Sequence, residues 1–197
     1  MTSPPPRSVL PLFPLGTVLY PGGLLPLRIF EVRYLDMISK CHRAGTPFGV
    51  VGLTQGSEVR VAGAAAEQFA SIGTLALIRS FESPQSGLMQ IECVGGSRFR
   101  VRSSELHKHG LWTAEVEMLD EDVALPIPDD LRHTAEALQR LVRTLEERQR
   151  LQAEATGTAP RLPLAEPFRF DDCGWVANRW CELLPLQAEL KQRLMEL

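Results

Sequence analysis

The chain has 197 residues and a formal net charge of -3 at pH 7. Apolar residues make up 44% and charged residues 23%, a balance that is typical of folded globular proteins and excludes a disordered or fibrous chain. Because a domain that binds phosphates normally carries a basic surplus, nucleic acid is unlikely as the main partner of this slightly acidic chain.

A mostly apolar stretch opens the chain, LFPLGTVLYPGGLLPLRIFEVRY at residues 12–34. Prolines interrupt it and charged residues end it, so we do not expect a membrane-spanning helix. Prolines at positions 4–6 occupy the place of the basic segment of a signal peptide, and no small-residue cleavage site follows the apolar part. The sequence therefore predicts neither membrane association nor secretion.

Two strands are expected within this stretch, at residues 9–13 and 24–30, with a turn at residues 20–23 whose glycines permit positive φ. The prolines predict edge or kinked strands. From Glu31 the apolar residues recur at helical spacing, and Gly45 stands where a C-terminal cap is expected. A short helix is therefore expected after the strands. Its apolar stripe comprises Val32, Leu35, Ile38 and Cys41.

Strand patterns then return in several short segments. They cover residues 48–53, 74–81, 88–94, 97–102 and 111–119. Gly95-Gly96 suits a two-residue hairpin turn, and residues 83–87 suit a longer one. Short strands joined in this way indicate a closed or nearly closed antiparallel barrel. Residues 62–70 fit either a turn of helix or a loop.

The pattern becomes helical after about residue 125. Asp129 or Asp130 can cap a long helix, and Asp171 or Asp172 a second one that carries Trp175 and Trp180 as packing residues. A third helix is expected at residues 186–194. The stripe of the first comprises Leu131, Ala135, Leu138, Val142 and Leu145. The sequence thus predicts an α+β protein, with a β-barrel domain at residues 8–125 and a helical subdomain at 126–197.

The cysteines form neither a C-x-x-C pair nor a set with histidines at ligand spacing. The four residues are Cys41, Cys93, Cys173 and Cys181. The sequence therefore predicts no zinc site and no disulfide, and we expect reduced thiols in a cytoplasm. Cys181 lies in the apolar pattern of a helix and is interpreted as a small buried apolar residue.

Three stretches, in this order, resemble the N-terminal, substrate-binding domain of the ATP-dependent Lon proteases. They are LPLFPLGTVLYPGGLLPLRIFEVRY, then FGVV with IGTLALI, then GGSRFRV followed by AEVEMLD. The resemblance covers residues 8–122 and continues more weakly through LLPLQAELKQRLMEL. Val32 stands where family members often have proline. Since valine keeps its amide hydrogen, the helix can begin slightly earlier.

This resemblance implies a PUA-like antiparallel pseudo-β-barrel with one short helix and a C-terminal helical subdomain, used in the proteases to engage polypeptide. The chain contains no G-x-x-x-x-G-K-[ST] phosphate loop, and 197 residues leave no room for ATPase and protease domains as well. We therefore expect a stand-alone, non-catalytic, cytoplasmic protein of bacterial type without a cofactor or metal. It would bind unfolded or partly folded polypeptide, either for a separate protease or ATPase or as an independent regulator.

Two sets of residues are singled out for these roles. A structural role is expected for Glu31, Arg33, Tyr34, Gly95 and Gly96. For Glu31 and Arg33 we expect buried or half-buried hydrogen bonds to the barrel backbone, with a direct ligand role as the alternative. A bound polypeptide would need an apolar patch with rigid aromatic anchors. The residues expected to form part of that patch are Tyr20, Leu25, Phe30 and Trp112.

Residues 103–109, SSELHKH, contain every residue type of a hydrolase triad. Adjacent positions cannot aim their side chains at one another as nucleophile, base and orienting acid, so the segment is interpreted as a polar connection. A metal bound by His107 and His109 would lack an evident third ligand. A small hydrolase therefore stands third among the functions considered.

An RNA-binding PUA-like domain is the alternative function. Arg98, Arg100 and Arg102 alternate along one strand and share a face, which suits contact with RNA. Glu115 and Glu117 alternate on the strand expected beside it, so cross-strand ion pairs are the preferred interpretation of the arginines.

Overall fold

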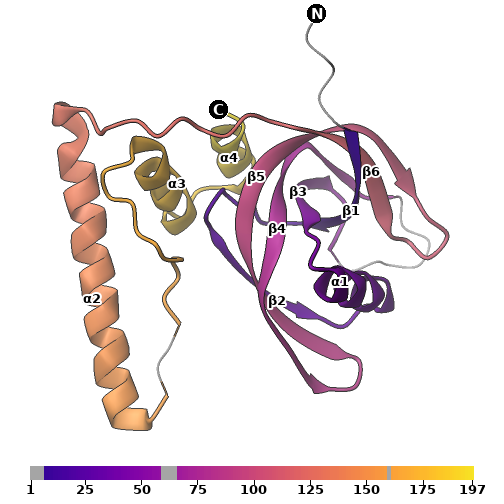
Figure 1. The fold of residues 1–197 in the computed structure, drawn as a ribbon, viewed down its shortest axis with the longest axis horizontal. Helices are drawn as coiled ribbons and strands as arrows, with labels where there is room; N and C mark the ends of the chain where they lie inside the picture. The colour runs from indigo at the N-terminus through magenta and orange to yellow at the C-terminus, as the bar shows by residue number, and fades with distance from the viewer. Residues whose placement is uncertain (1–6, 59–65, 159–160) are drawn as a thin grey trace, which may run out of the picture. The chain divides into compact units, whose positions relative to one another are not determined.

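A computed structural model describes residues 7–58, 66–158 and 161–197. Figure 1 shows the order of the elements along the chain. They are β1 (Arg7–Leu15), β2 (Leu24–Ile29), α1 (Val32–Ala44), β3 (Phe48–Gln55), β4 (Gln68–Gln85), β5 (Leu88–Leu106), β6 (Trp112–Met118), a 3-10 turn (Asp129–Leu131), α2 (Arg132–Thr156), α3 (Cys173–Leu183) and α4 (Ala188–Met195). The α+β class is confirmed. Within the described residues, no helix is long and apolar enough to cross a membrane.

The chain divides into two compact units. The first comprises residues 1–121 together with 186–197, and the second comprises residues 122–185. The predicted division into domains at residues 125 and 126 stays a prediction. In the structure, α4 groups with the barrel strands rather than with the other C-terminal helices.

The strands of the first unit form a closed barrel. Their order is β2-β5-β4-β3-β1-β6, and β5 also pairs with β6, which closes five of them into a ring and leaves β2 at an edge (Figure 1). The expectation of antiparallel pairing fails at one place, because β1 and β3 are parallel. The chain between them contains β2 and α1, a crossover long enough to bring β3 back in the direction of β1.

β1 is a strand of the ring in spite of its two prolines. Residues 7–12 pair with β6 and residues 12–15 with β3, so the two ladders overlap only at Leu12. Pro11 and Pro14 therefore each lie where one side of the strand is unpaired, the kind of position at which a strand tolerates proline. The expected edge strand is β2, which carries Pro26.

The hairpin predicted at Gly95-Gly96 is wrong, because β5 runs through both glycines. Neither has the positive φ that a two-residue hairpin turn requires. Gly95 instead allows a close approach, because a Cβ at this position would clash with the carbonyl oxygen of Tyr20. Backbone hydrogen bonds join Gly95 to Gly22 and Gly23 at this point. The hairpin expected at residues 83–87 is confirmed, with Gln85 opposite Leu88.

Helix α1 covers one of the two apolar cores of the barrel unit. Its predicted C-terminal cap is confirmed: Gly45 has φ 64°, and Gly45 and Thr46 donate to the carbonyls of His42 and Cys41. The predicted stripe is rotated, since Val32 is 74% exposed while Arg33 is buried. The buried residues of the helix are Arg33, Tyr34, Met37, Ile38 and Cys41.

The second unit has its own small core, in which α2 packs against α3. Trp175 is buried there, and the indole of Trp180 donates to the carbonyl of Thr134 at 3.1 Å. Asp172 caps α3 as predicted, accepting from Gly174 and Trp175. The predicted cap of α2 is wrong, because Asp129 and Asp130 lie in a preceding 3-10 turn and no side chain caps that helix.

The cysteines are free thiols. Cys41 and Cys93 are buried, whereas Cys173 and Cys181 are half-buried, so the burial expected for Cys181 is only partial. Of the ambiguous segment 62–70, residues 62–65 lie outside the described part of the chain, and residues 68–70 begin β4.

Candidate binding groove

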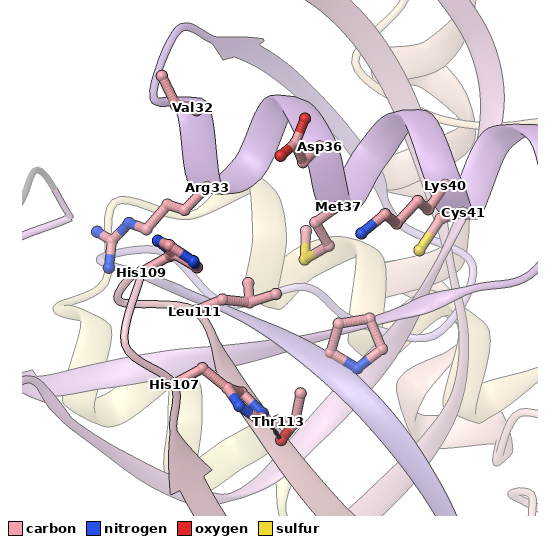
Figure 2. A pocket seen from close by; sticks show the side chains of 11 residues that line it. Val32, Arg33, Asp36, Met37, Lys40, Cys41, His107, His109, Leu111 and Thr113 are labelled. Carbon is pink, nitrogen blue, oxygen red and sulfur yellow. Dashed lines mark hydrogen bonds between the residues drawn. The ribbon is translucent and has the colours of Figure 1, made fainter.

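A groove of about 680 Å³ lies in the first unit, between α1 and the connection from β5 to β6 at residues 107–111. Its volume lies within the range of about 300–1,000 Å³ that is usual for ligand pockets. Figure 2 shows Met37 and Leu111 pointing toward one another across it. The lining residues are Pro11, Val32, Arg33, Asp36, Met37, Lys40, Cys41, His107, His109, Leu111 and Thr113.

One wall of the groove is a single face of α1. Residues 33, 37 and 41 follow one another at intervals of four, so their side chains lie along the same side of the helix. Tyr34, on the adjoining buried face, stacks on Phe13 with the ring centroids 3.9 Å apart. This stacking fixes α1 on the barrel and gives the groove a rigid wall.

Arg33 ties this wall to three other segments. Its guanidinium donates to the carbonyl of Gly110 at 2.7 Å and to the carbonyl of Glu58 at 3.3 Å. It also pairs with the carboxylates of Glu31 at 3.1 Å and Glu67 at 3.2 Å. We call these five residues the Arg33 junction. Through it, the position of α1 determines the position of the β5–β6 connection, and therefore the width of the groove.

The charges of the Arg33 junction stabilise one another. Burial alone would lower the pKa of Arg33, but Tyr34, Glu31 and Glu67 raise it above its ordinary value. Burial would likewise raise the pKa of Glu67, but hydrogen bonds from its own backbone, from Trp112 and from Arg33 lower it overall. The arginine is therefore a compensated cation, and Glu67 is an ionised acceptor at neutral pH.

The opposite wall is the β5–β6 connection. Gly110 has φ 81° and its N–H donates to the carbonyl of His107, which makes a tight turn. The imidazole Nε2 of His107 lies 2.8 Å from Thr113 Oγ1, and Figure 2 shows this bond at the base of the groove. His109 extends toward Arg33 in the same view. Leu111 thus faces α1 from a turn that is fixed by the hydrogen bonds of His107 and Gly110.

The four residues expected to anchor a polypeptide are not brought together. Tyr20 is 0% exposed, and Leu25 is buried in the core that α1 covers. Phe30 is 58% exposed and precedes Val32, which lines the groove. Trp112 is half-buried against Phe69 and donates to Glu67 at 3.2 Å. Trp112 therefore lies between two groove residues in the sequence and Phe30 lies two positions before one, whereas Tyr20 and Leu25 are distant from the groove residues.

The residues expected to be structural occupy the groove wall and the nearby barrel. Glu31 is the N-cap residue of α1, but its carboxylate pairs with Arg33 and caps no backbone N–H. Tyr34 lies beneath the Arg33 guanidinium, which is 4.4 Å from the ring centroid. Gly95 and Gly96 lie in β5, where Gly95 allows the turn at residues 20–23 to contact the strand and Gly96 faces Leu75 and Leu77 of β4.

The segment 103–109 is divided between β5 and the turn after it, which separates its serines from its histidines. Among the described residues, no group of three or more His, Cys, Asp or Glu side chains is placed to hold a metal ion. Burial raises the pKa of Cys41, so the one thiol that lines the groove is a weak nucleophile. The arrangement suits binding through apolar contact and hydrogen bonds.

The arginines of β5 contact other parts of the first unit. Arg102 pairs with Glu117 on β6, as expected. Arg98 donates to the carbonyl of Met195 at the end of α4, at 2.9 Å. The register places Arg100 opposite Glu117 and Ser103 opposite Glu115. Two of the three arginines that would suit RNA, Arg98 and Arg102, thus already have partners within the first unit.

The groove was missed by sequence reasoning because its residues come from distant parts of the chain. Pro11, Met37 and Leu111 are apolar residues of a kind that usually fills a core, so none carries a local signal for a binding site. The pair His107 and His109 beside Gly110 is the feature that pointed most nearly to it. Their sequence pattern suggests metal ligands or members of a catalytic triad, and it does not indicate a groove.

Comparison with known proteins identifies the domain type. A family model described as the ATP-dependent protease La (LON) substrate-binding domain matches residues 9–197. A solved structure of a Lon N-terminal domain protein from Xanthomonas campestris is 29% identical, with a TM-score of 0.70 over 96% of this chain and 90% of that one. The N-terminal domain of the Mycobacterium avium complex Lon protease is 16% identical, with a TM-score of 0.56 over 96% and 90%. The second likeness shows the fold alone.

Proposed function

The chain belongs to the family of Lon substrate-binding domains, and from this membership we propose that it binds unfolded or partly folded polypeptide in the groove between α1 and the β5–β6 connection. The role is binding without catalysis, for a separate protease or ATPase or as an independent regulator. The observation that carries the proposal is the groove itself: an apolar centre formed by Met37 and Leu111, with polar residues around it, in a chain that matches the family throughout residues 9–197.

The composition of the groove suits an unfolded chain rather than a folded surface. Unfolded segments expose the apolar side chains that a folded protein buries, and each such side chain gains free energy on leaving water. Met37 offers a flexible, polarisable contact surface that adapts to side chains of different shape. Phe30 and Val32 extend this apolar surface onto the outside of the domain.

The proposal is tested by fluorescence anisotropy with a labelled, permanently unfolded polypeptide and its folded counterpart. We expect micromolar binding of the unfolded form alone. Leu111→Asp places a charge at the centre of the groove and is expected to weaken binding at least about tenfold, because burying an unpaired carboxylate is costly. Leu77→Asp is the matched control, since Leu77 is an exposed leucine of β4 that does not line the groove.

Equal affinity of the Leu111→Asp and Leu77→Asp variants would place polypeptide binding elsewhere on the domain. Equal binding of the folded and unfolded forms would reject recognition of unfolded chains. Salt-sensitive binding of RNA, with none to either polypeptide, would favour the RNA-binding alternative.

We place this function in the bacterial cytoplasm. The free thiols of the four cysteines support a reducing compartment, where structural disulfides are rare. Oxidation-sensitive loss of binding in a purified sample, reversed by a reductant, would agree with this location.

A further inference from the structure

The charged groups around the groove are not equivalent, although the groove holds both signs. Arg33 is compensated by Glu31 and Glu67, so its charge is already used within the Arg33 junction. Lys40, in contrast, is exposed and forms no ion pair with any described residue. Lys40 is therefore the cation of this groove that an incoming ligand can pair with.

The orientation of Lys40 favours such contact. Figure 2 shows its ammonium on the same side of α1 as Met37, toward Leu111, whereas the carboxylate of Asp36 points away from Leu111. Among the described residues, Asp36 is the one carboxylate that lines the groove, one helical turn before Lys40. A ligand group beside Met37 and Leu111 would thus meet the lysine before it meets the aspartate.

The opposite wall adds hydrogen-bonding nitrogens. His107 shares one ring nitrogen with Thr113, and His109 extends from the turn toward Arg33. Among the described residues, the carboxylate of the lining is that of Asp36, and it points away from Leu111, so a basic ligand group beside the apolar centre would find no partner equivalent to Lys40. The charges of the groove therefore complement a ligand that carries an anionic group next to an apolar one.

We propose that the groove selects polypeptide segments in which an apolar side chain lies next to an acidic residue, the apolar group entering between Met37 and Leu111 and the carboxylate pairing with Lys40. This inference rests on the proposed function and specifies its substrate class. Because Lys40 is exposed, the pair contributes selectivity rather than most of the affinity. Most of the affinity comes from the apolar contact of the ligand side chain with Met37 and Leu111.

The test compares three labelled peptides that share one central leucine and carry glutamate, glutamine or lysine at the flanking positions. We expect the glutamate peptide to bind about fivefold more tightly than the glutamine peptide, and the lysine peptide to bind most weakly. The preference should shrink as salt is added, because exposed charges are screened. Anisotropy titration with the full chain measures all three affinities.

Two variants connect the preference to Lys40. Lys40→Gln is expected to abolish the difference between the glutamate and glutamine peptides, whereas Asp36→Asn is expected to increase it. Arg43→Gln is the matched control: Arg43 is an exposed cation in the last turn of α1 and does not line the groove. All three substitutions are on the exposed surface, and circular dichroism checks that each variant remains folded.

The outcomes separate this inference from the proposed function. Equal affinity for the three peptides, or a preference that Lys40→Gln leaves unchanged, would overturn charge selection while polypeptide binding stands. A preference lost equally in Lys40→Gln and Arg43→Gln would show a general field effect and also overturn it. If no peptide binds, the inference and the proposed function are both rejected.

Discussion

Two junctions of the barrel unit each attach a helix to the barrel strands, and they do so with different chemistry. The Arg33 junction holds the groove wall, and the second, which we call the α4 junction, holds the last helix through Tyr20, Arg98 and Gln192. Both use side chains that donate to main-chain carbonyls: Arg33 to Gly110, and Tyr20 to Lys191 at 2.6 Å. In the α4 junction, Gln192 also donates to the carbonyl of Ile72 at 3.0 Å.

The difference lies in what each junction leaves free. At the α4 junction the chain covers the barrel with its own helix, and Met195 is buried there. At the Arg33 junction the buried guanidinium joins the two walls through hydrogen bonds and ion pairs, and a groove remains between the walls. The open groove is thus found where ion pairs attach α1. The covered surface is found where hydrogen bonds attach α4.

Removing the cation should break the Arg33 junction and produce the largest effect. Arg33→Ala leaves the half-buried carboxylates of Glu31 and Glu67 without their partner, and we expect a loss of about 3 kcal/mol in the free energy of unfolding. Arg33→Lys keeps the charge but not the fork of donors, so an intermediate loss is expected. Urea denaturation measures each.

Arg43→Ala is the control for this measurement, since Arg43 is an exposed arginine of the same helix. A change within about 0.5 kcal/mol is expected there. If Arg33→Ala cost no more than Arg43→Ala, the Arg33 junction would not be what holds the groove walls.

A smaller effect is expected at the α4 junction. Tyr20→Phe removes one hydrogen bond to Lys191, and the expected loss is about 1 kcal/mol, together with faster hydrogen exchange in α4. Tyr34→Phe is the matched control, because the Tyr34 hydroxyl makes no hydrogen bond to a described residue. Peptide binding should be unchanged in both, and weakened binding in Tyr20→Phe would show that the two junctions are coupled.

The smallest expected effect is a pH dependence of the free energy of unfolding. It comes from Glu67 of the Arg33 junction, so it should distinguish this junction from the α4 junction without disrupting either. The pKa of Glu67 is lowered below its ordinary value of 4.5, so its ionised form stabilises the fold at pH above that value, and this contribution is lost as the pH falls through the lowered pKa. We expect Glu67→Gln to cost under about 1 kcal/mol at neutral pH.

The difference between wild type and Glu67→Gln should shrink as the pH falls below 4.5, and should be lost once the pH lies well below the lowered pKa of Glu67, where the carboxyl is as neutral as the amide. Urea denaturation at several pH values measures it. A difference that stays constant down to that pH would mean that the carboxylate charge plays no part in the Arg33 junction.

Local chemistry explains which features the sequence could predict. Gly45 and Asp172 act through neighbours within a few residues, so both caps were predictable from spacing alone. Gly95 was misread because its role depends on Tyr20, which approaches from another segment. The apolar stripe of α1 was misassigned at Val32, which is exposed, because the stripe was read from periodicity alone. Periodicity does not reveal the carboxylates of Glu31 and Glu67 that compensate the buried Arg33.

The position of α4 along the chain has a consequence for synthesis on the ribosome. The hydrogen bond from Tyr20 to Lys191 joins residues 171 positions apart, and the second unit lies entirely between them. The strands of the barrel are complete by Met118, so the emerging barrel has its ring before the helix that covers it exists. Until translation passes residue 195, the surface around Tyr20, Thr74 and Arg98 stays uncovered and available to a chaperone.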